Sequence, residues 1–265
     1  MSLDQGVPRD DSLPLGRVRV GLKRNHMIIY VDLENLEQLE RQYPDRVLTS
    51  LGNRLKVKYR LEDISGEPCL VMRYHQVTPD RLRALPVNAV LVSGNMTEFE
   101  FYSEESLAGL RAVMQEAAYP LLAFCGGCQI LAQTYGVAIG PIGQLPMTAN
   151  DAQADVVLAP GMVQERGFMP VDVCQPHPLF AGLGERPVFF ESHYWEVKSA
   201  PAGFRSYAST AKCQVQMLAH DTKQLFATQF HPEFYDEEHL DGRTLLANFF
   251  RQVGVTGGIE RTHCL

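Results

Sequence analysis

The apolar positions in the first half of the chain alternate between short runs and longer stretches with helical spacing. Short apolar runs, the first of them with β-branched residues, predict strands at residues 27–31, 69–74, 89–92 and 121–124. The spacing between them predicts helices over 36–55, where Pro44 interrupts the pattern, over 104–118, and from 129 to 135. The segment 55–61 alternates apolar and polar residues, which predicts one more strand. Strands that alternate with helices favour a mostly parallel sheet with helices on both faces.

The second half of the chain has a different pattern. Short strands separated by turns are predicted at 156–158, 188–190, 195–197 and 214–218, then a strand at 225–230 and a final helix at 244–253. This favours a small antiparallel β section beside the parallel sheet. Residues 1–25 are polar and contain several Gly and Pro, so we expect a flexible arm, followed by one domain at 26–255 and a tail at 256–265.

Composition narrows the class of protein. The 265 residues are 45% hydrophobic and 21% charged, which is ordinary for a globular protein. The formal net charge of −7 argues against a general nucleic-acid binder. We find neither an apolar run of the ~18–20 residues that span a bilayer nor a secretory signal. The six cysteines lack disulfide-framework spacing. We therefore expect a cytoplasmic protein that contacts neither membrane nor nucleic acid.

Cys125 stands where a predicted strand turns directly into a helix. The strand 121–124 ends at this cysteine, and Gly126 and Gly127 follow it. A nucleophile at such a turn has a strained backbone and lies at a helix N-terminus, which favours a thiolate. The plain alternative is a small core cysteine beside a glycine turn. The C-x-x-C formed with Cys128 could hold a metal or a redox pair, but no second Cys/His pair has zinc spacing. We expect no metal and no cofactor.

A second candidate group follows the strand at 225–230. His231, Pro232 and Glu233 place an imidazole and a carboxylate two residues apart, so both can point to the same side of an extended chain. A cysteine nucleophile needs an imidazole to exchange its proton, and the imidazole needs a carboxylate to orient it. A surface histidine beside a turn proline is the alternative. His177 also precedes a proline but has no acid at this spacing.

These two segments together resemble the class I (triad) glutamine amidotransferases, and in particular glutaminase domains of the GMP-synthetase type. Residues 123–129 correspond to the motif G-x-C-x-G-x-Q, with Ala123 in place of the first glycine, and residues 229–233 give Q-F-H-P-E without a break. The resemblance implies a flavodoxin-like glutaminase fold. It also implies a catalytic triad of Cys125, His231 and Glu233.

The resemblance implies further site residues. Residues 93–96 stand where the family has S-G-G-P, but Asn95 and Met96 replace the second Gly and the Pro. Backbone N–H groups of Gly94 and Gly126 are the expected oxyanion hole. We expect Gln129, Ser192, His193 and Tyr194 to bind the substrate, the last three largely through backbone atoms.

The expected function is glutamine hydrolysis through a cysteine thioester. No phosphate-binding loop or ATP-binding half is visible, so ammonia would pass to a separate synthetase or acceptor subunit. Two alternatives stay open. One is a γ-glutamyl hydrolase or peptidase that uses the same triad. The other is a non-catalytic binding module that keeps the fold.

Overall fold

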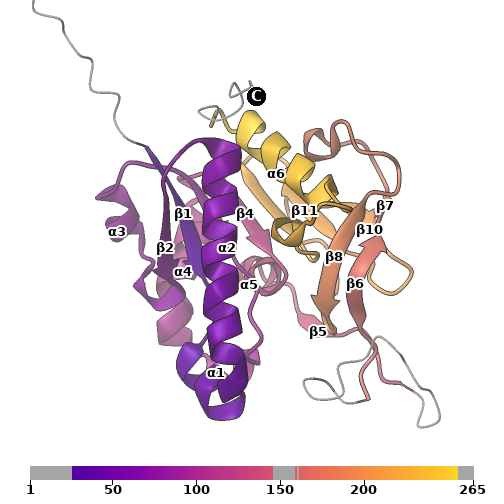
Figure 1. Ribbon diagram of the computed structural model, residues 1–265, viewed down its shortest axis with the longest axis horizontal. Coiled ribbons are helices and arrows are strands. Elements are labelled where there is room, and N and C mark those ends of the chain that lie inside the picture. The colour runs from indigo at the N-terminus through magenta and orange to yellow at the C-terminus, as the bar shows by residue number, and fades with distance from the viewer. Residues whose placement is uncertain (1–25, 146–158, 160, 256–265) are drawn as a thin grey trace, which may run out of the picture.

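The computed structural model describes residues 26–145, 159 and 161–255, and its centre is an eight-stranded sheet (Figure 1). From one edge to the other the strands are β2 (Cys69–Arg73), β1 (Met27–Asp32), β3 (Val87–Val92), β4 (Leu121–Phe124), β12 (Leu225–Thr228), β11 (Met217–His220), β10 (Phe204–Ser209) and β7 (Asp172–Val173). The first five strands are parallel to one another. The remaining three pair antiparallel, so β12 joins the two kinds of pairing.

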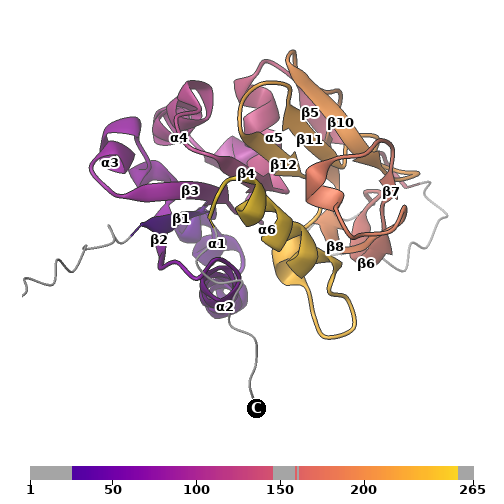
Figure 2. The same ribbon diagram turned by 90° about the horizontal axis from the view of Figure 1, so that it is seen from above.

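Helices cover both faces of the sheet (Figure 2). The helices are α1 (Leu36–Gln42), α2 (Val47–Ser65), α3 (Pro79–Arg83), α4 (Glu104–Glu116), α5 (Gly126–Thr134) and α6 (Asp241–Gln252). Side chains of α3, α4 and α5 share one apolar cluster with the sheet, and those of α2 and α6 share the other. The buried strands of the parallel half are almost continuously apolar because both faces are covered.

Two small antiparallel sheets complete the second half. One pairs β5 (Ile139–Pro141) with β9 (Trp195–Val197), and the other pairs β6 (Glu165–Pro170) with β8 (Val188–His193). The expected fold class is therefore confirmed: a mostly parallel sheet with helices on both faces, and a small antiparallel section. The strand expected at 156–158, the arm and the tail lie outside the described residues.

The strand expected at 55–61 is wrong, because these residues lie inside α2. The buried positions of this helix include Ser50, Arg54, Val57 and Leu61, at intervals of three or four that mark a helical face. Leu55 and Tyr59 are apolar but point outward, and their interleaving with Val57 and Leu61 produces the false period of two. The helix thus has apolar residues on two faces.

Most of the other elements expected from the sequence are present in the structure. The strands expected at 27–31, 69–74, 89–92 and 121–124 are confirmed as β1, β2, β3 and β4. The strand expected at 214–218 begins three residues late, since β11 starts at Met217. Strands β5, β6, β7 and β10 were not predicted. No helix within the described ranges is long and apolar enough to cross a membrane.

Candidate active site

Cys125 occupies a strained turn between β4 and α5. Its φ of 47° and ψ of −109° lie in a region that residues with a side chain rarely adopt. Such a conformation costs about 1–3 kcal/mol and persists only where the surroundings impose it. The turn also requires close packing behind it, because a Cβ on Gly127 would lie 2.8 Å from the Val92 carbonyl oxygen. The thiol therefore stands at the N-terminus of α5, as the sequence predicted.

His231 and Glu233 follow β12 and bond to each other. The imidazole Nδ1 lies 2.7 Å from Glu233 Oε1, and both side chains are buried. The His231 backbone N–H donates to the Phe190 carbonyl, and the ring stacks on Phe234 with 5.0 Å between ring centroids. These contacts fix the plane of the imidazole and leave its Nε2 edge to face away from the carboxylate.

The sheet brings the cysteine and the histidine together. Because β4 and β12 are parallel neighbours, their carboxyl ends meet at one edge, and the Cys125 backbone N–H donates to the Thr228 carbonyl at 2.8 Å. A Cβ on Gly94 would lie 2.8 Å from His231 Cε1 and 3.1 Å from Cys125 Cβ. Both side chains therefore pack against Gly94, and only glycine fits there.

The charges around His231 favour its protonated form. Burial alone lowers the pKa of this imidazole, but the neighbouring Glu233 and Cys125 outweigh burial and raise the pKa to about 10. An imidazolium beside the thiol can stabilise a thiolate and then give its proton to a leaving group.

A cavity of about 510 Å³ opens beside the thiol. Its lining includes Cys125, Gly126 and the predicted substrate-binding residues Gln129, Ser192, His193 and Tyr194. The Ser192 carbonyl oxygen lies 3.9 Å from Cys125 Sγ, which places this backbone segment against the nucleophile. Predicted site residues from two segments, 125–129 and 192–194, therefore lie at one cavity, whereas Gly94, His231 and Glu233 do not line it.

Gln129 and Gln229 form a bridge below the thiol that the sequence did not reveal. Gln229 Nε2 lies 3.6 Å from Cys125 Sγ, and its Oε1 accepts a hydrogen bond from Gln129 Nε2 at 3.2 Å. Gln129 Nε2 also donates to the Trp195 carbonyl at 3.0 Å. The amide nitrogen of Gln129 therefore makes its hydrogen bonds within the protein. Gln229 and His231 are two residues apart just after β12, so their side chains can point to the same side of an extended chain. This alternation could have revealed Gln229 from the sequence.

The loop that departs from the family pattern is held by buried charges. Met96 and Thr97 donate their backbone N–H groups to the Glu34 carboxylate at 2.8 and 3.1 Å. Arg54, which is paired with Asp32 at 2.7 Å, donates to the Gly94 carbonyl at 3.0 Å. These contacts join residues 22 to 63 positions apart, so sequence spacing could not have shown them.

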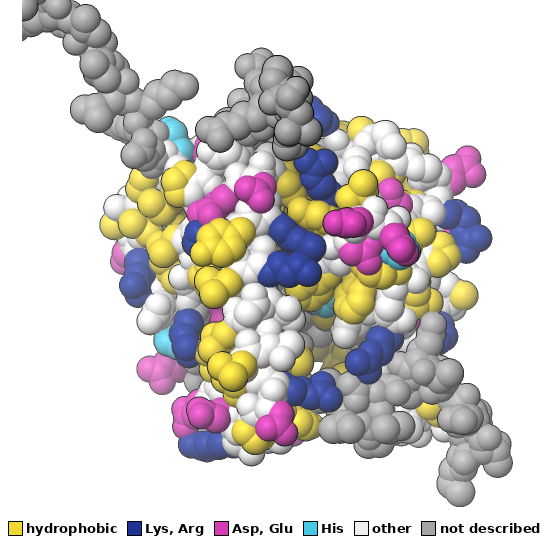
Figure 3. Space-filling model, in the orientation of Figure 1, with side chains coloured by type: hydrophobic (Ala, Val, Ile, Leu, Met, Phe, Trp, Pro, Cys, Tyr) yellow, Lys and Arg dark blue, Asp and Glu magenta, His cyan; other side chains and the backbone are white. Residues whose placement is uncertain are grey.

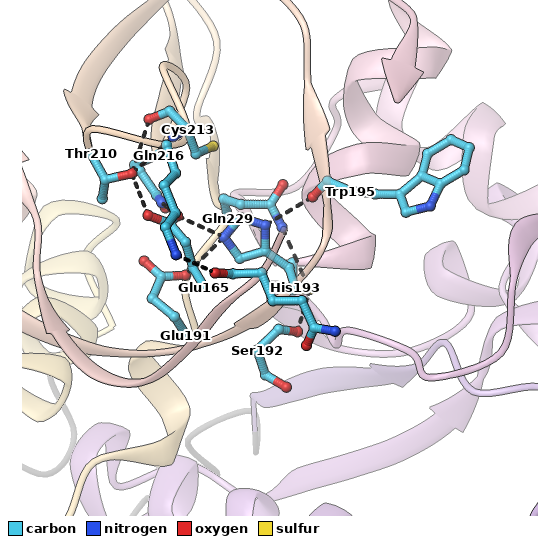
Figure 4. Close-up of polar contacts among 12 residues, drawn as sticks. Glu165, Glu191, Ser192, His193, Trp195, Thr210, Cys213, Gln216 and Gln229 are labelled. Atoms are coloured by element: carbon cyan, nitrogen blue, oxygen red, sulfur yellow. Dashed lines mark hydrogen bonds and ion pairs between the residues drawn. The ribbon is translucent and has the colours of Figure 1, made fainter. Parts of the chain in front are cut away.

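His193 belongs to a second buried cluster of charged and polar side chains (Figure 4). Its Nε2 lies 3.1 Å from Glu165 Oε2 and 3.2 Å from Glu191 Oε2, while Nδ1 lies 2.9 Å from the Trp195 carbonyl. Burial lowers the pKa of this imidazole, but the two carboxylates outweigh burial and raise the pKa well above its usual value. Burial raises the pKa of Glu191. Both ring nitrogens of His193 are therefore occupied.

The same cluster contains the metal-ligand grouping found among the described residues, which is Glu165, His193 and Cys213. Their ligand atoms lie within 4.8 Å of one another. Glu165 is already used, however, since it also accepts hydrogen bonds from Thr210 and Gln216 at 2.6 and 2.7 Å. Burial raises the pKa of the Cys213 thiol, which disfavours the thiolate that a metal needs. The donor chemistry fits a hydrogen-bonded cluster better than a metal site.

Comparison with protein families matches residues 60–253 to "Glutamine amidotransferase class-I". The glutamine-hydrolysing GMP synthase of Oleidesulfovibrio alaskensis is 31% identical over 218 residues, which are 80% of this chain and 36% of that protein. One subunit of the glutamine-hydrolysing GMP synthase of Thermoplasma acidophilum is 31% identical over 145 residues, 55% of this chain and 62% of that protein. The chain thus spans about a third of the full-length relative.

Solved structures show the same fold. A crystal structure of a GMP synthase subunit from Thermoplasma acidophilum superposes with a TM-score of 0.61 and 24% identity, over 86% of this chain and 92% of that one. A glutamine amidotransferase from Methylobacillus flagellatus superposes with a TM-score of 0.58 and 14% identity, over 89% and 98% of the two chains.

Proposed function

Because this chain belongs to the class I glutamine amidotransferase family, we propose that it hydrolyses the side-chain amide of glutamine at Cys125 and supplies the ammonia to a separate synthetase. The proposal rests on the position of Cys125, which has a strained backbone at a helix N-terminus. Cys125 and the His231 imidazole both pack against Gly94, and this imidazole is paired with Glu233. A core cysteine beside a glycine turn would need neither the strain nor the paired imidazole.

The first half of the reaction forms a thioester. The Cys125 thiolate attacks the carboxamide carbon, and the oxygen becomes an oxyanion that backbone N–H groups at Gly94 and Gly126 stabilise. His231 gives its Nε2 proton to the amide nitrogen. The carbon–nitrogen bond then breaks, ammonia leaves, and a γ-glutamyl thioester remains on Cys125.

The second half releases glutamate. Neutral His231 takes a proton from a water molecule as that water attacks the thioester carbon, and the carbon–sulfur bond breaks to regenerate the thiolate. Glu233 keeps the proton on Nδ1 and stabilises the imidazolium in both halves, as their 2.7 Å contact allows. In this proposal Ser192, Tyr194 and Gln129 hold the amino-acid end of the substrate within the 510 Å³ cavity.

The names of several relatives support a separate partner. Several are named as one subunit of a glutamine-hydrolysing GMP synthase, which indicates a glutaminase made as a chain of its own. We propose that a separate synthetase chain receives the ammonia. A γ-glutamyl hydrolase would use the same triad, and the substrates that are turned over distinguish it.

Two measurements test the proposal. The first is release of glutamate from glutamine beside release of amine from γ-glutamyl amides, with Cys125→Ala as the control. Glutamine turnover that Cys125→Ala abolishes supports the proposal, and turnover of γ-glutamyl amides alone would overturn it in favour of a hydrolase. The second is mass spectrometry after treatment with a glutamine-like diazoketone, which needs no partner. We expect one adduct on Cys125 and none on the exposed Cys174. Absence of the Cys125 adduct would indicate a non-catalytic module.

A further inference from the structure

The outer face of α2 has a stripe of apolar side chains that nothing in the described chain covers. Leu48 is 81% exposed, Leu51 38%, Leu55 52% and Tyr59 57%, at spacings of three and four residues that place them in one row. Among the described residues, the other large hydrophobic side chains with such exposure are Leu70, Phe101 and Leu240, which lie on separate elements. Figure 3 shows apolar side chains running down the helix that α2 forms in Figure 1.

Gly52 lies within this stripe, and none of the described residues packs where its side chain would be. It is exposed, and a Cβ built on it would meet nothing within 4 Å. A glycine in the interior of a helix costs about 1 kcal/mol relative to alanine. A second helix that crosses there would give the glycine a function, because the missing side chain lets two backbones approach closely.

We propose that this face, the α2 stripe of Leu48, Leu51, Gly52, Leu55 and Tyr59, is where two copies of the chain pair as a symmetric dimer with antiparallel α2 helices. Leu48 and Leu55 are equally distant from the midpoint between Leu51 and Gly52, whereas the counterpart of Tyr59 is position 44 (103 − 59), just before α2. A two-fold axis through that point places Leu48 of each copy opposite Leu55 of the other. Self-complementarity of this kind is what a two-fold interface requires.

The charges beside the stripe fit the same arrangement. Asp45, in the 3₁₀ turn η1 (Pro44–Arg46) that leads into α2, and Lys56 are both exposed. They are 11 residues apart (56 − 45), or about three helical turns, so they lie on the same flank of the stripe. In an antiparallel pair each flank faces its own symmetry copy. Position 45 is level with position 58 of the other copy (103 − 45), so Lys56 lies two residues, or about 3 Å, from Asp45 along the helix axis, within reach of its long side chain, twice per dimer.

The stripe is also separate from the features that the family explains. Leu48 to Tyr59 precede residue 60, where the family match begins. The opposite face of α2 is the one that contacts the candidate active site, through Arg54 on the Gly94 carbonyl and Arg60 on the Glu233 carbonyl. The proposal therefore does not depend on the chemistry proposed for Cys125.

The test is the mass of the full chain in solution over a range of concentrations, by sedimentation equilibrium. We expect a dimer for the wild type. Leu55→Glu buries two charges against leucines, so its dissociation constant should rise by at least about 100-fold. Leu240→Glu changes an equally exposed leucine (50%) off the stripe and should leave the dissociation constant unchanged. A melting curve by circular dichroism checks that each variant folds. A wild type that stays monomeric, or a dimer that Leu55→Glu does not weaken, would overturn the proposal.

A charge swap tests the antiparallel register. Asp45→Lys and Lys56→Asp each place like charges opposite one another, so each variant alone should dimerise about tenfold more weakly. Mixed in equal amounts, the two variants restore both pairs. The lysine introduced at position 45 of one copy then faces the aspartate introduced at position 56 of the other, and the unchanged Asp45 faces the unchanged Lys56. The mixture should therefore associate as tightly as the wild type. A mixture no tighter than its components would rule out this register.

Discussion

Two buried histidines lie close to Cys125, and their surroundings differ in one respect that decides what each can do. His231 pairs Nδ1 with Glu233 and packs its other edge against Gly94 and the thiol. His193 has both nitrogens occupied, Nδ1 by a backbone carbonyl and Nε2 by Glu165 with Glu191 beside it. Both imidazoles have a raised pKa. A raised pKa therefore does not identify a catalytic histidine, whereas a ring nitrogen directed at the reacting group does.

We infer that His193 positions neighbouring residues. It lies between Ser192, whose carbonyl approaches Cys125 Sγ, and the Tyr194–Trp195 segment that lines the cavity. By bonding to Glu165 of β6 and to the Trp195 carbonyl, the ring fixes the backbone at the end of β8. The cluster thus shapes one wall of the site from behind, while His231 lies at the reaction centre that we propose.

Replacing each histidine with asparagine tests this difference most directly. His231→Asn removes the group that exchanges the proton, so we expect kcat for glutamine hydrolysis to fall by about 10⁴-fold, at the upper end of general acid–base effects. His193→Asn should cause a far smaller loss per folded molecule. The measurement is glutamate release, normalised to the folded fraction at low temperature. Equal losses in the two variants would remove the distinction between them.

For His193 we expect a large effect on stability, in contrast to its small effect on activity. His193→Asn leaves Glu165 and Glu191 buried without their cation, and we expect the free energy of unfolding to fall by about 3–5 kcal/mol. Urea denaturation measures this loss. The double variant His193→Asn/Glu165→Gln also removes one carboxylate charge, so it should recover part of the loss. A single variant as stable as the wild type would show that the cluster holds no ion pair.

The charge on Glu233 should set the alkaline limit of activity. Because the pKa of His231 is raised to about 10, the imidazolium is present below that pH and is lost above it. Glu233→Gln removes a raising cause, so the alkaline limb of the kcat/KM profile should move down by about 1–3 pH units. The exposed Glu237→Gln is the matched control. An unmoved limb would mean that another group titrates there.

The smallest expected effect is at Glu191. Burial raises its pKa toward the neutral acid, which an amide of the same shape resembles. We expect Glu191→Gln to change the free energy of unfolding by about 1 kcal/mol or less. The same urea titration provides the value. A loss as large as that of His193→Asn would place the essential negative charge on Glu191 instead of Glu165.

The sequence revealed the groups whose positions depend on local pattern. The strand at 121–124, its turn at Cys125 and the His231–Glu233 pair were readable because each lies within a few residues of the strand end that positions it. The apolar runs of the parallel half were readable for the same reason, since strands buried on both faces allow few polar residues.

The buried charged residues around the site could not be predicted from local pattern. Glu165 lies on a strand that was not predicted and pairs with a histidine 28 residues later, and a single carboxylate gives no periodic signal. Glu34 and Arg54 act on a loop about 40 to 60 residues away. The second apolar face of α2 misled the prediction outright, because the rule that apolar residues point inward fails where a surface is left uncovered.

The pairing of β4 with β12 has a consequence for how the protein acquires activity. The Cys125–Thr228 hydrogen bond closes a loop of 103 residues (228 − 125), and nearly all of the antiparallel section lies inside that loop. Contacts that close long loops form late, since the chain loses the corresponding entropy before it gains the contact. Recovery of catalysis during refolding would therefore report the completed chain topology, well after helices α2 and α4 have formed from local contacts.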